Sequence, residues 1–120
     1  MNETSIKAKL RALIKPHCYI QSMSSLATSG TPDLWLSGRR DLWLEIKQDQ
    51  TTKGAIKPDL SPLQEQWCNN RYDEGRLVMV LVATDTKTGI LYQNRTWNMH
   101  GNDRRPLKEI VEYILGVVGT

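Results

Sequence analysis

The sequence predicts one α/β domain in which helices flank a mixed central β-sheet, and three observations lead to this prediction. The chain has 120 residues, which is the size of a single domain. Apolar residues make up 39% and charged residues 24% of it, as in ordinary globular proteins. Segments of helical and of strand character follow one another in the order α-β-β-β-α-β-β-α. We therefore expect one domain over residues 1–120, without repeats or linkers.

The first helix is expected between Asn2, a suitable N-cap, and Pro16, which disfavours helix at the preceding residue. Its apolar residues recur at helical spacing: Ile6, Leu10, Leu13 and Ile14. A separate stripe is basic: Lys7, Arg11 and Lys15. Glu3 continues the apolar stripe, so we expect its carboxylate to point inward at the start of the helix.

Strand-like segments dominate the next part of the chain. A strand is expected over residues 17–23, and the small, polar residues 24–31 predict a loop. Residues 32–36 and 41–48 alternate between apolar and polar side chains, which predicts a β-hairpin. A polar, basic loop over 49–59 follows.

The second half begins with a well-marked helix. Ser61 supplies an N-cap, Pro62 suits the first helical position, and Gln64 completes a capping box. Its expected buried side is formed by Leu63, Trp67 and Cys68. Gly75 is suited to the left-handed conformation that ends a helix.

Residues 77–83 form a continuous apolar run, which is typical of a central strand covered on both faces. A turn over 85–89 and a short strand over 90–93 are expected next, whereas 96–105 shows no clear periodicity. The last helix follows Pro106 and is expected to end near Gly116. Its apolar face is formed by Leu107, Ile110, Val111, Ile114 and Leu115.

Composition excludes several classes of protein. The run over 77–83 is far shorter than the ~20 apolar residues of a membrane span, and no signal peptide is recognisable. Cys18 and Cys68 lack the spacing of a disulfide framework or zinc site, so we expect reduced thiols in an intracellular protein. His17 and His100 likewise show no metal or triad spacing. The net charge of +3 tolerates a polyanionic partner without predicting one.

The register of the hairpin brings polar side chains together. The leucines of the two strands share one face only if Asp33 lies opposite Glu45, which requires a three-residue loop over 38–40. In that register Asp33, Glu45 and Lys47 lie together, with Trp35 and Trp43 beside them.

Two facing carboxylates repel each other unless a cation lies between them. Oxygen ligands select a hard cation such as Mg²⁺, which is held by one or two carboxylates together with water and substrate phosphate. Lys47 lies two residues beyond Glu45 on the same face, where it could orient or deprotonate an attacking water and stabilise charge on a phosphate. The pattern therefore predicts a site for phosphodiester hydrolysis.

These residues resemble the PD-(D/E)xK nuclease superfamily, with Pro32-Asp33 and Glu45-Ile46-Lys47 as its motif. Within that superfamily, the stretches 30–34 and 60–67 look like VRR-NUC-type and phage Holliday-junction-resolving nucleases. The resemblance covers roughly residues 3–83. It implies a restriction-endonuclease-like αβββαβ core.

The resemblance also implies roles for individual residues. Asp33, Glu45 and the backbone carbonyl of Ile46 would hold Mg²⁺, for which Mn²⁺ would substitute, and Lys47 would be catalytic. The helical Glu of the family would fall on Glu3, for which the alternative is an acid that stabilises the first helical turn. Its helix Gln would fall on Gln64, for which the alternative is a capping residue alone.

Basic residues outside the motif are candidates for DNA contact. Lys53 and Lys57 lie in the loop after the catalytic strand, and Arg39 and Arg40 lie at the hairpin tip. Solvated surface charges are the alternative interpretation for all four.

We therefore expect a Mg²⁺-dependent DNA endonuclease, acting as a homodimer on branched DNA such as Holliday junctions inside a bacterial or phage-infected cell. One domain leaves little room for reading a long sequence, and cutting two strands needs two sites. Alternatives are a sequence-specific homing or restriction-like enzyme, a nickase, a non-catalytic nucleic-acid-binding module, or a small structural or inhibitor protein.

Overall fold

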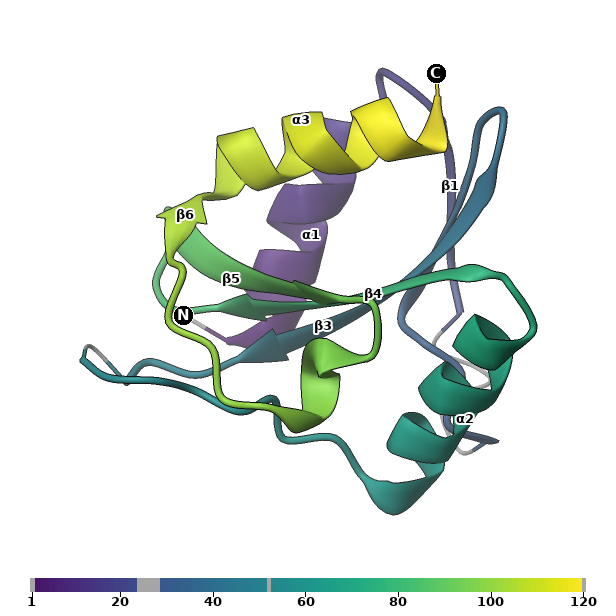
Figure 1. Cartoon of the computed structure of the whole chain (residues 1–120). Helices are drawn as coiled ribbons and strands as arrows, with labels where there is room; N and C mark the ends of the chain where they lie inside the picture. Colours follow the sequence, from purple (N-terminus) through teal and green to yellow (C-terminus); the bar gives the residue numbers. More distant parts are fainter. Residues whose placement is uncertain (1, 24–28, 52, 120) are drawn as a thin grey trace.

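Six strands form one mixed sheet in the computed structural model, which describes residues 2–23, 29–51 and 53–119 (Figure 1). The strands lie side by side in chain order: β1 (Tyr19–Ser22), β2 (Leu34–Ser37), β3 (Asp41–Gln48), β4 (Leu77–Ala83), β5 (Thr88–Gln93) and β6 (Arg105–Pro106). Only β3 and β4 are parallel. The chain crosses between them through helix α2 (Pro62–Asp73), because parallel strands need a long crossover. The predicted mixed sheet is confirmed.

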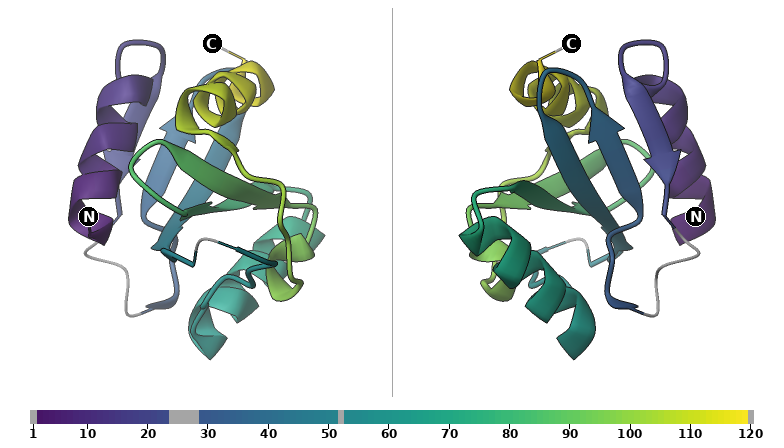
Figure 2. Two further views of the ribbon diagram at one scale, coloured as in Figure 1. Left: turned by 90° about the vertical axis from the view of Figure 1, so that its left-hand side faces the viewer. Right: turned by 90° about the vertical axis from the view of Figure 1, so that its right-hand side faces the viewer.

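Helices cover both faces of this sheet (Figures 1 and 2). Helices α1 (Glu3–Ile14) and α3 (Leu107–Val118) pack on one face, where they form the larger apolar core with the inward residues of β2 and β3. Helix α2 and the 3₁₀ helix η2 (Thr96–Asn98) cover the other face around the buried Trp97. Strand β4 contributes Met79 and Leu81 to the first core and Val80 to the second, so it is covered on both faces as predicted.

The two helices that later frame the site begin as the sequence predicts. Asn2 caps α1 by accepting a hydrogen bond from the Ser5 amide at 2.8 Å. Ser61 and Gln64 form a reciprocal capping box at the start of α2. At its other end Gly75 has a φ of +90°, which side chains other than glycine rarely adopt.

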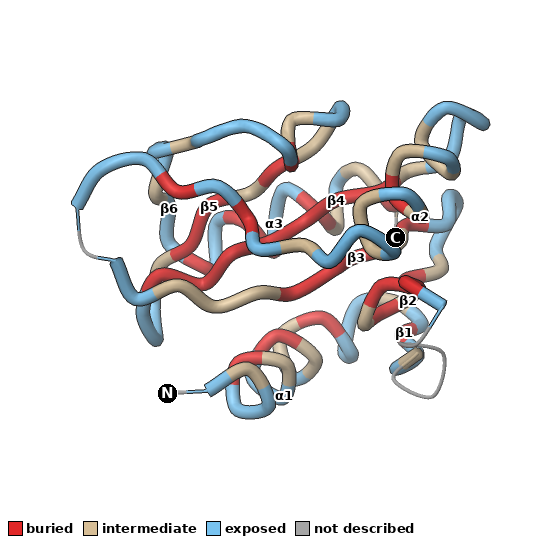
Figure 3. Tube along the Cα trace, turned by 90° about the horizontal axis from the view of Figure 1, so that it is seen from below, coloured by how far each residue is buried: buried red, intermediate tan, exposed pale blue. Residues whose placement is uncertain are grey.

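The hairpin of β2 and β3 has the predicted register. Trp35 pairs with Trp43, and Ser37 pairs with Asp41 across the three-residue loop. Asp33, immediately before β2, therefore lies opposite Glu45. The central strands are buried along most of their length (Figure 3).

Several details differ from expectation. Leu63 is 53% exposed rather than buried, because the inward face of α2 passes through Gln64 and Cys68 instead. Helix α3 continues through Gly116 to Val118 and ends at Gly119, which has a φ of +75°. Strand β5 begins at Thr88, two residues earlier than predicted. The segment 96–105 contains η2 and reaches β6.

Part of the predicted loop, residues 24–28, lies outside the described residues. Within the part of the chain that is described, no helix combines the length and apolar character that crossing a membrane requires.

Candidate active site

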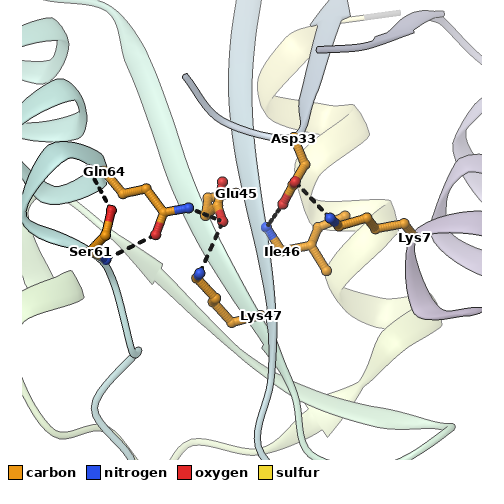
Figure 4. A network of polar contacts seen from close by, with 7 residues as sticks. All are labelled: Lys7, Asp33, Glu45, Ile46, Lys47, Ser61 and Gln64. Atoms are coloured by element: carbon orange, nitrogen blue, oxygen red, sulfur yellow. Dashed lines mark hydrogen bonds and ion pairs between the residues drawn. The ribbon is translucent and has the colours of Figure 1, made fainter. Parts of the chain in front are cut away.

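Glu45 is a buried carboxylate on the α2 side of the sheet. Its neighbours Leu44 and Ile46 point into the larger core, so strand alternation turns Glu45 to the opposite face. Only 3% of Glu45 is exposed. Its Oε2 accepts a hydrogen bond from Gln64 Nε2 at 3.1 Å and lies 3.5 Å from Lys47 Nζ (Figure 4).

The capping box of α2 holds Gln64 in this position. Gln64 Oε1 accepts a hydrogen bond from the Ser61 amide at 3.0 Å, and Ser61 Oγ accepts one from the Gln64 amide at 3.1 Å. The side-chain NH₂ of Gln64 remains to donate to Glu45. Gln64 therefore caps α2 and also contacts Glu45. A role as a capping residue and a role in the site are compatible.

Gly30 allows the loop before Asp33 to pack against the start of α2. A Cβ at Gly30 would lie 2.3 Å from the Leu63 carbonyl oxygen, which is closer than any real Cβ contact. Its φ of +85° also favours glycine. This close approach holds the segment that carries Asp33 against the helix that carries Gln64.

Asp33 has a different environment, at the edge between β2 and α1. Its Oδ2 accepts a hydrogen bond from the Ile46 amide at 2.8 Å, and its Oδ1 forms an ion pair with Lys7 Nζ at 2.8 Å (Figure 4). The side chain of Asp33 is 14% exposed and that of Lys7 34%. Asp33 thus bonds to the backbone of the strand that carries Glu45, while its charge is balanced from α1.

Burial and charge shape the electrostatics of the site. Burial, followed by the negative charge of Asp33, raises the pKa of Glu45 from 4.5 to about 8, although Lys47 and Lys7 both oppose this. Partial burial by itself would lower the pKa of Lys7, but its hydrogen bond to Asp33 and the charges of Asp33, Glu3 and Glu45 raise it. A cation placed beside Asp33 and Glu45 would therefore stabilise the charged form of this carboxylate pair.

An aromatic row lies beside Glu45 on the same face of the sheet. Trp35 and Trp43 stack with ring centroids 5.9 Å apart, and Trp67 of α2 meets Trp43 edge-on at 5.4 Å. Arg71 lies over the Trp67 ring at 5.8 Å. The predicted placement of Trp35 and Trp43 beside Glu45 and Lys47 is confirmed.

Glu3 lies in the first turn of α1, four residues before Lys7, and is half-buried. It forms no ion pair with another described residue, and it reaches the site through its charge on Lys7. At Ile46 the structure establishes the amide contact to Asp33. The described residues contain no group of three or more His, Cys, Asp or Glu side chains that could hold a metal ion. Any ion here would thus depend on Asp33 and Glu45 together with main-chain oxygen and water.

The four basic candidates for DNA contact are exposed, and Arg39 and Arg40 lie away from the carboxylates. Arg39 and Arg40 occupy the hairpin tip, five or more residues from Glu45, or about 16 Å along the strand. Their amides bond to carbonyl groups at the end of α3. Lys53 and Lys57 lie in the loop after β3. In the described ranges, none of the four side chains forms an ion pair.

Lys7 is the residue that sequence reasoning assigned to the wrong place. Its basic stripe was expected to lie apart from the inward stripe of Glu3. The structure turns Lys7 to Asp33, because residues at i and i+4 share a helix face and the stripe of Glu3 and Lys7 borders β2. The i, i+4 spacing of Glu3 and Lys7 was a usable signal.

Comparisons with known proteins identify the fold. No protein-family model matches the chain, and no curated protein matches it. Among solved structures, it is similar to a VRR_NUC domain protein, with 19% identity and a TM-score of 0.52 over 72% of this chain and 81% of that one. It is also similar to Hjc, a Holliday junction resolvase from the archaeal hyperthermophile Archaeoglobus fulgidus. Identity there is 16% and the TM-score 0.60, over 93% of this chain and 98% of that one. The chain therefore has the resolvase-like nuclease fold, and the expected restriction-endonuclease-like class is confirmed.

Proposed function

We propose that the protein is a metal-dependent DNA endonuclease that cuts branched DNA. One observation carries the proposal: Asp33 and Glu45 meet in register on a nuclease fold, with Lys47 beside Glu45. The similarity to a VRR_NUC domain protein and to a Holliday junction resolvase supports the choice of substrate.

The donor set fits a hard divalent cation. Two carboxylates are what Mg²⁺ ordinarily takes from a protein, with water and phosphate as its other ligands. Burial, followed by the negative charge of Asp33, raises the pKa of Glu45, and the positive charges of Lys47 and Lys7 oppose this as a bound cation would. Asp33, Glu45 and the carbonyl of Ile46 would hold Mg²⁺, or Mn²⁺ in its place. A bound ion would supply Lewis-acid stabilisation of phosphate charge and a more acidic water.

The residues of the chain divide the remaining work. Lys47 Nζ donates hydrogen bonds to the attacking water and to a phosphate oxygen as negative charge develops there. Gln64 holds the carboxylate of Glu45 in one orientation. Glu3 supports the charge balance through Lys7. Water attacks phosphorus and gives up a proton to solvent, the bond from phosphorus to the leaving oxygen breaks, and that oxygen takes up a proton from solvent.

Cleavage of four branched and linear substrates tests this function. The panel consists of labelled four-way-junction, flap, single-stranded and linear duplex DNA, each with Mg²⁺, Mn²⁺ or EDTA. We expect metal-dependent cutting confined to branched DNA, and its loss in Glu45→Gln. Glu112→Gln is the matched control, since Glu112 is exposed on α3. Full activity of Glu45→Gln would refute the site.

Other outcomes would select other functions. Cutting of particular linear duplexes would indicate a homing or restriction-like enzyme, and cutting of one strand would indicate a nickase. Binding without cleavage in either metal would indicate a nucleic-acid-binding module.

Two strands cut at one junction require two sites, so we propose a homodimer acting inside a bacterial or phage-infected cell. Light scattering at micromolar concentration tests the dimer, and a monomer would contradict it. Contact of DNA by Arg39, Arg40, Lys53 and Lys57 is part of the same proposal. Their exposure supports it, and a uniform loss of affinity on Gln substitution would be the expected result.

A further inference from the structure

A cavity of about 390 Å³ opens beside Asp33, between α1 and the strands β1 and β2. Its lining includes two cations, two hydroxyl groups and one carboxylate: Lys7, Arg11, Thr4, Ser22 and Asp33. Asp33 belongs both to this cavity and to the candidate active site. The cavity is therefore a direct extension of that site.

Arg11 carries a positive charge in this cavity that no described acid balances. Its Nη1 donates a hydrogen bond to Ser22 Oγ at 2.7 Å, and no ion pair involving Arg11 occurs in residues 2–23, 29–51 and 53–119. The sequence over 24–28, which follows Ser22 closely, contains no acidic residue. A guanidinium has five N–H donors, so the bond to Ser22 leaves most of them for a ligand.

Helix geometry sets the spacing of the two cations. Four residues separate Lys7 from Arg11, which is a rise of about 6 Å along α1. The Cα atoms of Lys7 and Arg11 are therefore about 6 Å apart along the helix axis, and Lys7 is the one that pairs with Asp33. Successive nucleotides of one DNA strand rise about 3.4 Å along the duplex axis, so a strand that passes Asp33 reaches Arg11 within one or two nucleotides.

We propose that this cavity is a subsite for a backbone phosphate next to the one that is cut, and that Arg11 contacts that phosphate. The proposal rests on the proposed nuclease function and specifies how the substrate strand runs, along α1. A guanidinium matches phosphate geometry through paired hydrogen bonds, and Ser22 holds this one in place. Lys7 would neutralise the same strand nearer to Asp33.

Salt-dependent binding without cleavage tests the subsite. Labelled four-way-junction DNA is titrated in EDTA by fluorescence anisotropy across a series of salt concentrations. We expect Arg11→Gln to bind about 3- to 10-fold more weakly, and the slope of log K against log salt to fall by about 0.9, as for one lost phosphate contact. Arg11→Lys keeps the charge and should keep most of the slope.

Lys9→Gln is the matched control, because it removes one charge from the other flank of the same helix, where Lys9 bonds to the Thr86 carbonyl. It should leave the slope near that of the wild type. Thr4→Glu is a second test that spares the Arg11–Ser22 contact. Thr4 is exposed in the first helical turn, where an acid favours the helix, so the variant should fold and still repel the phosphate.

The outcomes separate this proposal from the function it rests on. If the wild type binds and cuts but Arg11→Gln and Thr4→Glu bind with unchanged affinity and slope, the subsite is wrong and the nuclease function stands. If the wild type neither binds nor cuts any DNA of the panel, both are wrong.

Discussion

The two carboxylates of the site face each other in the same hairpin register, yet their environments differ. Glu45 is almost fully buried between β3 and α2, where Gln64 and Lys47 contact it. Asp33 lies at a more open edge, where it bonds to Lys7 of α1 and borders a cavity. The pairing of strands thus brings two identical functional groups together, while the helices packed on each side decide their properties.

This contrast assigns different tasks to the two halves. Burial holds Glu45 in one geometry and raises its pKa. This half of the site is therefore rigid, and the charged form of its carboxyl group is disfavoured. The Asp33 half has cations, hydroxyl groups and open volume, so it is the side on which we propose that the substrate strand approaches. A rigid half beside an open half suits a site that must hold its ligands and still admit a large substrate.

The largest expected effect would show that both halves are needed for cleavage. We expect Asp33→Asn to lower the cleavage rate on the order of 10³-fold, as expected for Glu45→Gln, because each variant removes a carboxylate that would hold the metal ion. Rates would be measured on the branched substrate with Mg²⁺. Asp41→Asn is the control, because Asp41 is exposed at the hairpin end of β3. Near-normal cleavage by Asp33→Asn would mean that Asp33 is not needed for the reaction.

Lys47 and Lys7 should affect cleavage and DNA binding differently, because each lies beside a different carboxylate. Lys47→Met should lower the cleavage rate about 10²-fold with little change in DNA affinity, because Lys47 acts on the reacting groups. Lys7→Met should lower it about tenfold and also weaken DNA binding in EDTA, because Lys7 balances Asp33 beside the cavity. Single-turnover rates and anisotropy measurements would separate the two patterns. Equal losses of rate and affinity in both variants would contradict the division of tasks.

Sequence reasoning predicted the Glu45 half well because its evidence was local. Alternation of leucines fixed the register that pairs Asp33 with Glu45, and Ser61 and Gln64 marked the start of α2. The contact between Gln64 and Glu45 required only that the inward face of α2 be assigned correctly. The apolar pattern predicts Leu63 on that face together with Trp67 and Cys68, whereas in the structure Leu63 is exposed and Gln64 contacts Glu45.

The Asp33 half could not be predicted in the same way, since it depends on how α1 packs across the sheet. The hydrophobic stripe of α1 establishes which face is buried but not which flank borders β2. The pattern therefore places Lys7 and Arg11 only on a basic stripe apart from the apolar one, whereas in the structure they line a cavity beside Asp33. Such contacts between distant segments depend on tertiary packing, which periodicity alone does not determine.

A smaller effect is expected on the pH dependence of stability, which should reveal the buried Glu45 half of the site. The pKa of Glu45 is about 8 in the folded protein against 4.5 as the ordinary value, so folding favours its neutral form. That contribution is complete below about pH 4.5 and is lost as the pH rises through 8. In urea unfolding with EDTA, we expect the free energy of unfolding of the wild type to fall by about 3 to 4 kcal/mol more than that of Glu45→Gln between pH 5 and pH 8.

Asp33→Asn provides the matching measurement. The charge of Asp33 is the second cause of the raised pKa, so this variant should show a reduced but still visible loss between the same pH values. If the free energy of unfolding depended on pH in the same way in the wild type and in Glu45→Gln, burial would not raise the pKa of Glu45.

The smallest effect separates the two roles of Gln64. Ser61→Ala and Gln64→Ala should each lower stability by about 1 kcal/mol, because each removes part of the capping box. Only Gln64→Ala should also lower cleavage, by about tenfold, since it frees the carboxylate of Glu45 to adopt other orientations. Urea unfolding and cleavage rates on the same preparations would compare them. Equal cleavage by the two variants would mean that Gln64 is a cap alone, and the fixed geometry of Glu45 would then depend on burial and Lys47.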